Sequence, residues 1–115
     1  MKMEHRSQIL INASIQVVPN DVVLLTADAN YTEIHFVDGR KTLYPLTLKS
    51  LENQFIDAGF FRTHKSYLVN LQFFKEVHWN RANPFMVLSN DYRVSIARRK
   101  RTKLRRTLKA MSVLA

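Results

Sequence analysis

The sequence contains no cysteine, which excludes both a disulfide framework and a thiolate metal site. It has only two glycines and three prolines, so most turns must depend on Asn and Asp. No apolar run approaches the roughly 20 residues needed to cross a bilayer, and residues 1–6 lack the apolar centre of a signal peptide. These absences predict a soluble, cytoplasmic domain that does not insert into a membrane.

Acidic residues are absent from the last 24 positions, whereas nine Lys and Arg residues lie there. Up to Asp91, nine cations and nine acids cancel, so the C-terminal end carries the whole formal net charge of +9. Eight of its cations lie between Arg98 and Lys109. Because such a run repels itself, it indicates a polyanionic partner. The composition permits a nucleic acid, an anionic membrane surface or an acidic protein.

Catalytic and metal-binding patterns are also missing. The four histidines are scattered, without the spacing of zinc ligands, and no glycine-rich phosphate-binding loop occurs. The carboxylates are dispersed over expected turns and strand surfaces. The sequence therefore predicts a protein that is not an enzyme and has neither metal nor cofactor.

The 115 residues suffice for one domain, and 46% of them are hydrophobic, enough for a real core. Short apolar or alternating segments with close turns predict a mainly β fold of stacked antiparallel sheets, with one short internal helix and a basic C-terminal helix. Residues 1–8 are expected to be frayed. Strands are expected at 9–18, 22–25, 31–37, 40–44, 67–69, 74–79, 85–89 and 92–96.

Local signals define some of these elements further. Asp38-Gly39 is typical of a two-residue type I′ hairpin turn, and residues 27–30 read as a turn or loop. Thr47 can cap a helix over 48–58, and Gly59 can end it in a left-handed conformation. From Arg98 onward, apolar residues with helical spacing predict a basic helix with one narrow apolar stripe.

Two polar segments are candidates for nucleic-acid contacts. Residues 62–66 place Arg, His, Lys and Ser between apolar anchors, so a loop bulging toward water is expected there. At 96–101 a strand passes into the basic helix, which suits phosphate binding and guanine recognition by Arg. The aromatic residues Trp79, Phe85 and Tyr92 could stack on bases, although their strand context favours packing in the core.

Residues 61–70, Phe-Arg-Thr-His-Lys-Ser-Tyr-Leu-Val-Asn, resemble the signature F-x-R-x-H-[RK]-S-[YF]-[ILV]-[VI]-N of the LytTR DNA-binding domain family. Residues 27–32 resemble the family's E-A-x-x-N-Y segment, and the chain end resembles its V-S-R-R stretch with a basic helix after it. The similarity spans about 19–108, within a single LytTR-like domain over residues 1–115.

The resemblance implies an elongated fold and a bacterial transcription regulator whose loops enter successive major grooves and bend the duplex. By position, base contacts are expected from Asn30, Tyr31, His64, Lys65, Arg98 and Arg99. Phosphate contacts are expected from Thr32, Ser66, Lys100, Arg101 and Lys103.

The implied partners are double-stranded DNA with paired repeat sites, a second copy of the chain on DNA, and a separate regulatory protein. No receiver domain precedes the segment, as expected of either a stand-alone regulator or one domain of a longer one; the leading Met and the tail favour the first. Two alternatives stay open from the residues alone. One is an RNA- or ribosome-associated basic protein, and the other is a membrane-surface module that uses Leu104, Leu108 and Met111.

Overall fold

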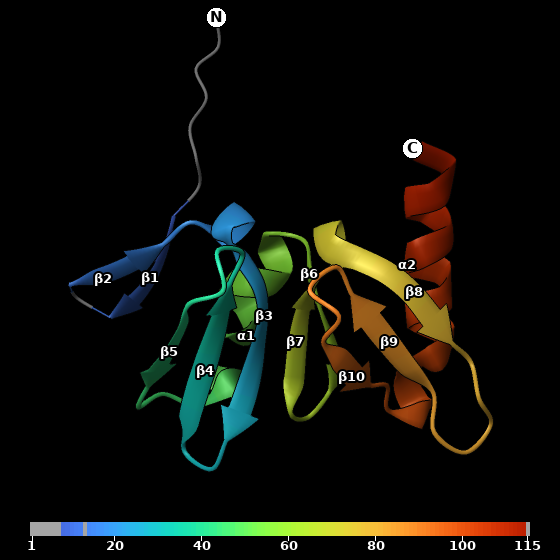
Figure 1. Cartoon of the computed structure of the whole chain (residues 1–115), viewed down its shortest axis with the longest axis horizontal. Helices are drawn as coiled ribbons and strands as arrows, with labels where there is room; N and C mark the ends of the chain where they lie inside the picture. The colour runs from blue at the N-terminus through green and yellow to red at the C-terminus, as the bar shows by residue number, and fades with distance from the viewer. Residues whose placement is uncertain (1–7, 13, 115) are drawn as a thin grey trace, which may run out of the picture.

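The computed structural model describes residues 8–12 and 14–114 of the chain, with side chains as far as Ser112. The expectation of a frayed N-terminus falls almost wholly on residues 1–7, outside the described part. The fold is mainly β, with antiparallel sheets and two α-helices, as the sequence predicts (Figure 1).

A five-stranded antiparallel sheet forms the centre of the molecule, with the strand order β5-β4-β3-β7-β6. Its strands are β3 (Val22–Asp28), β4 (Tyr31–Phe36), β5 (Lys41–Tyr44), β6 (Phe60–His64) and β7 (Tyr67–Asn70). The central strand β3 pairs with both β4 and β7, so it joins the two halves of the sheet.

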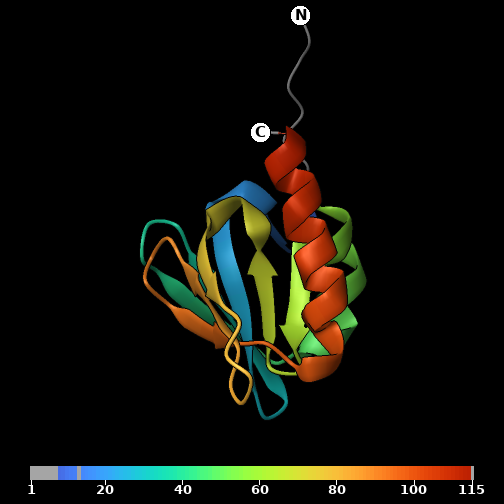
Figure 2. The same cartoon turned by 90° about the vertical axis from the view of Figure 1, so that its right-hand side faces the viewer.

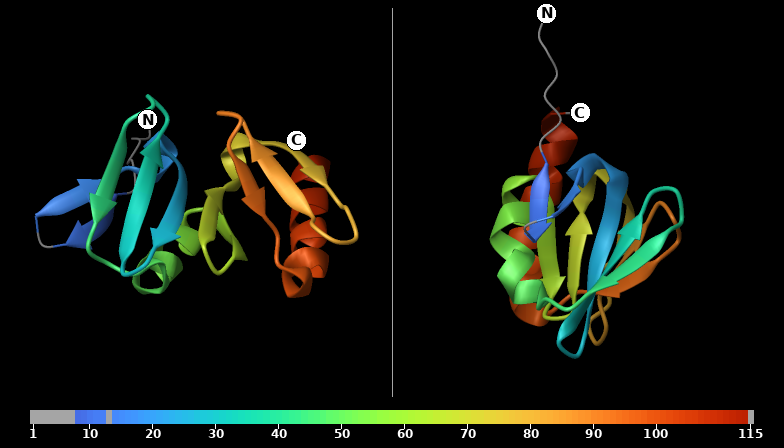
Figure 3. Two further views of the ribbon diagram at one scale, coloured as in Figure 1. Left: turned by 60° about the horizontal axis from the view of Figure 1, so that its bottom comes forward. Right: turned by 90° about the vertical axis from the view of Figure 1, so that its left-hand side faces the viewer.

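Each face of this sheet is covered by other elements, shown from the sides in Figure 2 and Figure 3. The first core includes residues of helix α1 (Leu48–Asp57) and of a hairpin of β1 (Ile9–Asn12) and β2 (Ile15–Val17). The expected single strand over 9–18 is thus two strands.

The second core includes residues of a three-stranded sheet and of helix α2 (Arg101–Leu114). That sheet comprises β8 (Phe74–His78), β9 (Phe85–Leu88) and β10 (Arg93–Ser95), and short 3-10 helices cover Pro19–Asp21 (η1), Leu71–Phe73 (η2) and Arg98–Lys100 (η3).

The apolar run at the start of β3 supplies both cores. Val22 and Leu25 belong to the first core, whereas Val23 and Leu24 belong to the second. Regular alternation would put Val23 and Leu24 on opposite faces, but the register with β4 shifts between Val22 and Leu24. This bulge explains why a continuous apolar run, and not an alternating one, forms a strand here.

Helix α1 has the boundaries that its capping signals predict. The Thr47 hydroxyl accepts a hydrogen bond from the Ser50 N–H at 3.2 Å, and Gly59 after the helix has a φ of +94°. Leu51 and Phe55 are buried, but Ile56, expected on the same face, is 42% exposed. The buried face is therefore narrower than the sequence suggests.

Two expected turns differ in the structure. In the β4–β5 connection, the Gly39 N–H donates to the Phe36 carbonyl at 3.0 Å, and Gly39 has a φ of +94° while Asp38 has no positive φ. A type I′ turn needs positive φ at both central residues, so that prediction is wrong; the loop has three residues, with glycine in the left-handed position. In the β3–β4 connection Asp28 pairs with Tyr31, so only Ala29 and Asn30 form the turn.

The polar segment 62–66 is mostly strand and not the expected loop. β6 continues to His64, β7 begins at Tyr67, and only Lys65 and Ser66 connect them. The register between β6 and β7 shifts around Thr63, whose side chain is fully buried. Backbone pairing with β7 thus continues strand β6 as far as His64, although the side chains of residues 62–64 are polar.

Asn70, at the end of β7, holds two distant carbonyls. Its side-chain N–H2 donates to the Val22 carbonyl at 2.9 Å and to the Pro19 carbonyl at 3.3 Å. Its side-chain oxygen accepts from the Gln72 N–H at 3.0 Å. Because the group is buried, these bonds fasten the start of β3 to the end of β7.

Replacement of Asn70 by Ala leaves these buried groups without partners. We expect Asn70→Ala to lower the free energy of unfolding by about 2 kcal/mol or more, measured by urea denaturation. Asn53→Ala, at an exposed position of α1, is the control and should stay within about 0.5 kcal/mol. Equal effects of the two substitutions would contradict this role.

Candidate nucleic-acid interface

Four connections lie along one edge of the molecule, at the bottom of Figure 1 and toward the viewer in the left panel of Figure 3. They are the β3–β4 turn, the β6–β7 turn, the β8–β9 loop at 79–84, and η3. Three backbone hydrogen bonds join them: the Ala27 N–H donates to the Ser66 carbonyl at 2.9 Å, the Ala97 N–H donates to the Thr63 carbonyl at 2.7 Å, and the Ile96 N–H donates to the Pro84 carbonyl at 3.0 Å. The edge is therefore a continuous and hydrogen-bonded surface.

His64 and Arg98, expected to act on one ligand, line the same depression of about 590 Å³. Its wall also includes Arg93 from β10, with Asn80 and Asn83 from the β8–β9 loop. Two guanidinium groups and several hydrogen-bonding side chains thus line one hollow. This geometry suits a ligand with both negative charge and polar edges.

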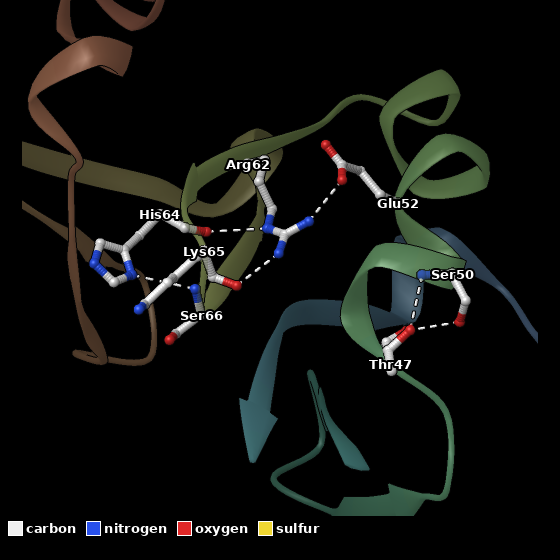
Figure 4. A network of polar contacts seen from close by, with 7 residues as sticks. All are labelled: Thr47, Ser50, Glu52, Arg62, His64, Lys65 and Ser66. Atoms are coloured by element: carbon white, nitrogen blue, oxygen red, sulfur yellow. Dashed lines mark hydrogen bonds and ion pairs between the residues drawn. The ribbon is translucent and has the colours of Figure 1, made fainter. Parts of the chain in front are cut away.

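Arg62 organises the β6–β7 turn from the side of α1, as Figure 4 shows. Its guanidinium donates to Glu52 Oε1 at 2.6 Å, to the His64 carbonyl at 3.0 Å and to the Lys65 carbonyl at 2.6 Å. The Arg62 side chain is only 14% exposed. Its charge is therefore used inside the protein, where it shapes the turn that presents its neighbours.

The imidazole of His64 has a defined proton position. The Ser66 backbone N–H donates to His64 Nδ1 at 3.1 Å, so Nδ1 must be unprotonated and the neutral ring carries its proton on Nε2 (Figure 4). Partial burial lowers the pKa of His64, and the charges of Lys65 and Arg62 lower it further. His64 thus offers one N–H donor at neutral pH.

The β3–β4 turn exposes two of the expected residues and withdraws a third. Asn30 is exposed, and Tyr31 is 45% exposed. Thr32 is fully buried, and its hydroxyl donates to the Leu46 carbonyl at 2.7 Å. The expected phosphate contact of Thr32 is wrong, because its only side-chain donor is used inside the first core.

The basic junction brings the largest group of cations to this edge. Arg98, Arg99 and Lys103 are exposed, whereas Lys100 and Arg101 are half-buried. Leu104 is fully buried in the second core, so it fixes the start of α2 against the sheets. The bond from the Ala97 N–H to the Thr63 carbonyl holds the start of η3 beside the β6–β7 hairpin.

Sequence reasoning missed Arg81, in the β8–β9 loop. Arg81 lines a second depression, of about 430 Å³, together with Arg98 and Arg101. It is the one cation in the polar break 80–84, and this isolated charge between two strands is the signal that could have identified it. The tertiary fold unites it with cations about 20 positions later in the chain.

The aromatic candidates for base stacking lie largely in packed positions. Trp79 and Tyr92 are partly buried against the second core. Phe85 stacks on His78 with ring centroids 4.5 Å apart, and the Arg93 guanidinium lies 4.1 Å from its ring centre. These rings are engaged by neighbours within the protein.

Other kinds of site find little support in the described residues. Over 8–12 and 14–114, no group of three or more His, Asp or Glu side chains is placed to hold a metal ion. Neither helix in that part of the chain has the length and apolarity required to cross a membrane.

The charges cancel up to Asp91, and a basic edge is built from turns of a β scaffold, a combination typical of a polyanion-binding module. Residues 12–109 match the LytTr DNA-binding domain family, and the chain belongs to that family. It is a DNA-binding family and not an enzyme family, as the sequence predicts.

Two similar proteins support this assignment. The sensory transduction protein LytT of Oceanobacillus iheyensis is 32% identical over 59 residues, which cover 51% of this chain and 24% of that protein. The chain thus matches about a quarter of the length of this relative. A LytTr DNA-binding domain from Bacillus cereus has the same fold, with a TM-score of 0.73, 19% identity, and coverage of 90% of this chain and 98% of that structure.

The depressed pKa of His64 predicts a pH-dependent stability. Since the folded protein takes up a proton at His64 less readily than the unfolded chain, stability is present above the unfolded pKa and decreases as pH falls through the folded value. Burial also lowers the pKa of His35, which adds to the same trend.

We expect the free energy of unfolding to fall between pH 7 and pH 5 in urea titrations. His64→Asn keeps an acceptor for the Ser66 N–H but does not titrate, so its decrease should be smaller, with His35 responsible for the remainder. An identical decrease in wild type and variant would show that His64 is not coupled to folding.

Proposed function

We propose that this domain regulates transcription by binding a specific sequence of double-stranded DNA, with its turns inserted in the major groove. The observation that supports this most is the shared depression lined by His64 and Arg98 on the basic edge. Residues more than 30 positions apart meet there, so one duplex can touch both. The cytoplasmic location stays a prediction of the sequence.

Base recognition is assigned to polar groups that three segments present at this edge. Arg98 or Arg99 can donate two parallel hydrogen bonds to guanine O6 and N7. His64 can donate through Nε2 to one of the same acceptors, with Lys65 beside it. Asn30 can pair with the edge of adenine, while Tyr31 provides an adjacent apolar ring.

Phosphate binding is assigned to Ser66, Lys100, Arg101 and Lys103, and now also to Arg81. The Lys and Arg side chains act through charge, so they hold all duplex sequences alike. Arg81 and Arg101 line one depression beside Arg98, and the repulsion among these cations favours a phosphate bound to Arg81 and Arg101.

The length of the edge favours a bent duplex and a paired arrangement. Short turns reach only a little beyond the scaffold, so contacts with successive grooves need the DNA to curve toward them. Each copy covers only a short site, and two copies on repeated sites would raise affinity by avidity. A separate regulatory protein, or a segment outside this chain, would supply the input signal.

Arg98 and Lys103 separate base reading from phosphate binding. We expect Arg98→Ala to cost about 1–3 kcal/mol on the matched duplex and to relax specificity at one base pair. Lys103→Ala should weaken matched and scrambled duplexes equally. The matched site comes from selection of bound sequences from a random duplex library, and affinities are measured by gel shift with RNA as competitor. Unchanged discrimination by Arg98→Ala would refute the proposal.

Arg81→Ala tests the phosphate contact from the β8–β9 loop. We expect weaker binding to every duplex, with the slope of log affinity against log salt reduced by about 1. Arg40→Ala is the control, because Arg40 lies in the β4–β5 turn on the opposite edge and pairs with Asp38. An Arg81→Ala variant with the wild-type salt slope would exclude Arg81 from the interface.

A further inference from the structure

A second basic surface lies apart from the DNA edge, in a groove of about 520 Å³ between α2 and β8. In Figure 2 these two elements face the viewer, with α2 rising away from η3 toward the C-terminus. The groove is lined from Thr102 to Ser112 along the helix, a span of about 15 Å at the rise of an α-helix. This length accommodates about three helical turns of a bound segment.

The groove combines an apolar base with a cationic border. Val77 from β8, Trp79 directly after that strand and Leu108 from α2 contribute half-buried apolar surface. The lining cations are Arg105, Arg106 and Lys109, and no acid lines the groove. Among the described residues none of these cations forms an ion pair, and the Arg105 guanidinium lies 4.6 Å from the Trp79 ring centre.

The position of these cations separates them from the DNA edge. Lys109 lies eight residues beyond Arg101, about 12 Å farther along the helix axis. The exposure of the apolar stripe of α2 increases in the same direction: Leu104 is fully buried, Leu108 is partly buried and Met111 is 37% exposed. The sheets therefore cover the first part of the stripe and leave the later part open beside the free cations.

We propose that this groove binds an acidic, amphipathic segment of a partner protein. Carboxylates of the segment pair with Arg106 and Lys109, and one apolar side chain packs on Trp79 and Leu108. Charge complementarity supports this occupant, since the border has three cations and no acid of its own. The domain would then hold DNA at one edge and a protein at the side of α2.

The apolar base favours a protein segment over other polyanions. A phosphate backbone has no side chain that could replace water on Trp79, Val77 and Leu108. A membrane surface is flat, whereas the apolar groups here lie inside a groove between two elements. A helix or extended segment with one apolar face fits both the shape and the charge.

Trp79 is the only tryptophan of the chain, so its fluorescence reports on the groove directly. The probe is a tryptophan-free peptide of about twelve residues, with Leu and Phe at i, i+3, i+4 and i+7 and Asp or Glu elsewhere. We expect saturable binding and a shift of Trp79 emission to shorter wavelength in about 0.15 M salt, where distant charges are screened. A scrambled peptide of equal composition, without an apolar face, should bind at least about tenfold more weakly.

Matched variants of α2 distinguish the two surfaces. Arg106→Gln with Lys109→Gln should weaken peptide binding by about tenfold and leave duplex binding within about threefold. Arg101→Gln with Lys103→Gln changes the charge equally outside the groove and should do the reverse.

Any of four results would overturn this inference while leaving the proposed function intact. They are no change in Trp79 emission with the peptide, equal binding of the scrambled peptide, loss of duplex binding instead of peptide binding in the groove variant, and an equal shift with phosphatidylglycerol vesicles. Loss of duplex binding would assign the groove to DNA, and the vesicle result would assign it to an anionic surface.

Discussion

Burial of the central sheet on both faces is the constraint on which the rest of the molecule depends. β3 supplies apolar residues to both cores, and its bulge at Val23 sets which residue faces which core. A slip of one residue would exchange the two sets of side chains, so the register is strongly fixed. The register also fixes the positions of the turns at the ends of these strands, because each turn begins and ends at a paired strand residue.

The backbone then links the turns to one another. The bond from Ala27 to Ser66 ties the first two connections, and the bond from Ala97 to Thr63 ties the second to the basic junction. Residues from separate parts of the chain thereby form one hydrogen-bonded edge. Hydrogen bonding within and between the sheets thus sets the spacing of the side chains along this edge.

Cations in this protein have different tasks, and burial separates them. Arg62 is surrounded by Glu52 and two carbonyls, which satisfy its donors and hold the β6–β7 turn. Arg98 and Arg99 have no such enclosure and face solvent. Helix α2 divides in a similar way: its first turn lies at the edge proposed to bind DNA, while its later cations border the groove beside β8. Leu104 anchors the first half to the second core, and Leu108 packs partly against it.

Local sequence signals determine the ends of α1 and most of the strands, independently of the tertiary structure. The cap at Thr47, the stop at Gly59 and the alternating strands depend on neighbours within a few positions, so the sequence alone predicts them. The charge asymmetry is likewise a property of composition. Side-chain polarity predicted a loop at 62–66, but backbone pairing with β7 makes most of it a strand. It also predicted a phosphate contact for Thr32, but the Thr32 hydroxyl is buried and bonded to the Leu46 carbonyl. Only the tertiary structure decided which cations are paired and which share a surface, since the ion pair of Arg62 with Glu52 and the depression shared by Arg81 and Arg98 bring together residues 10 or more positions apart.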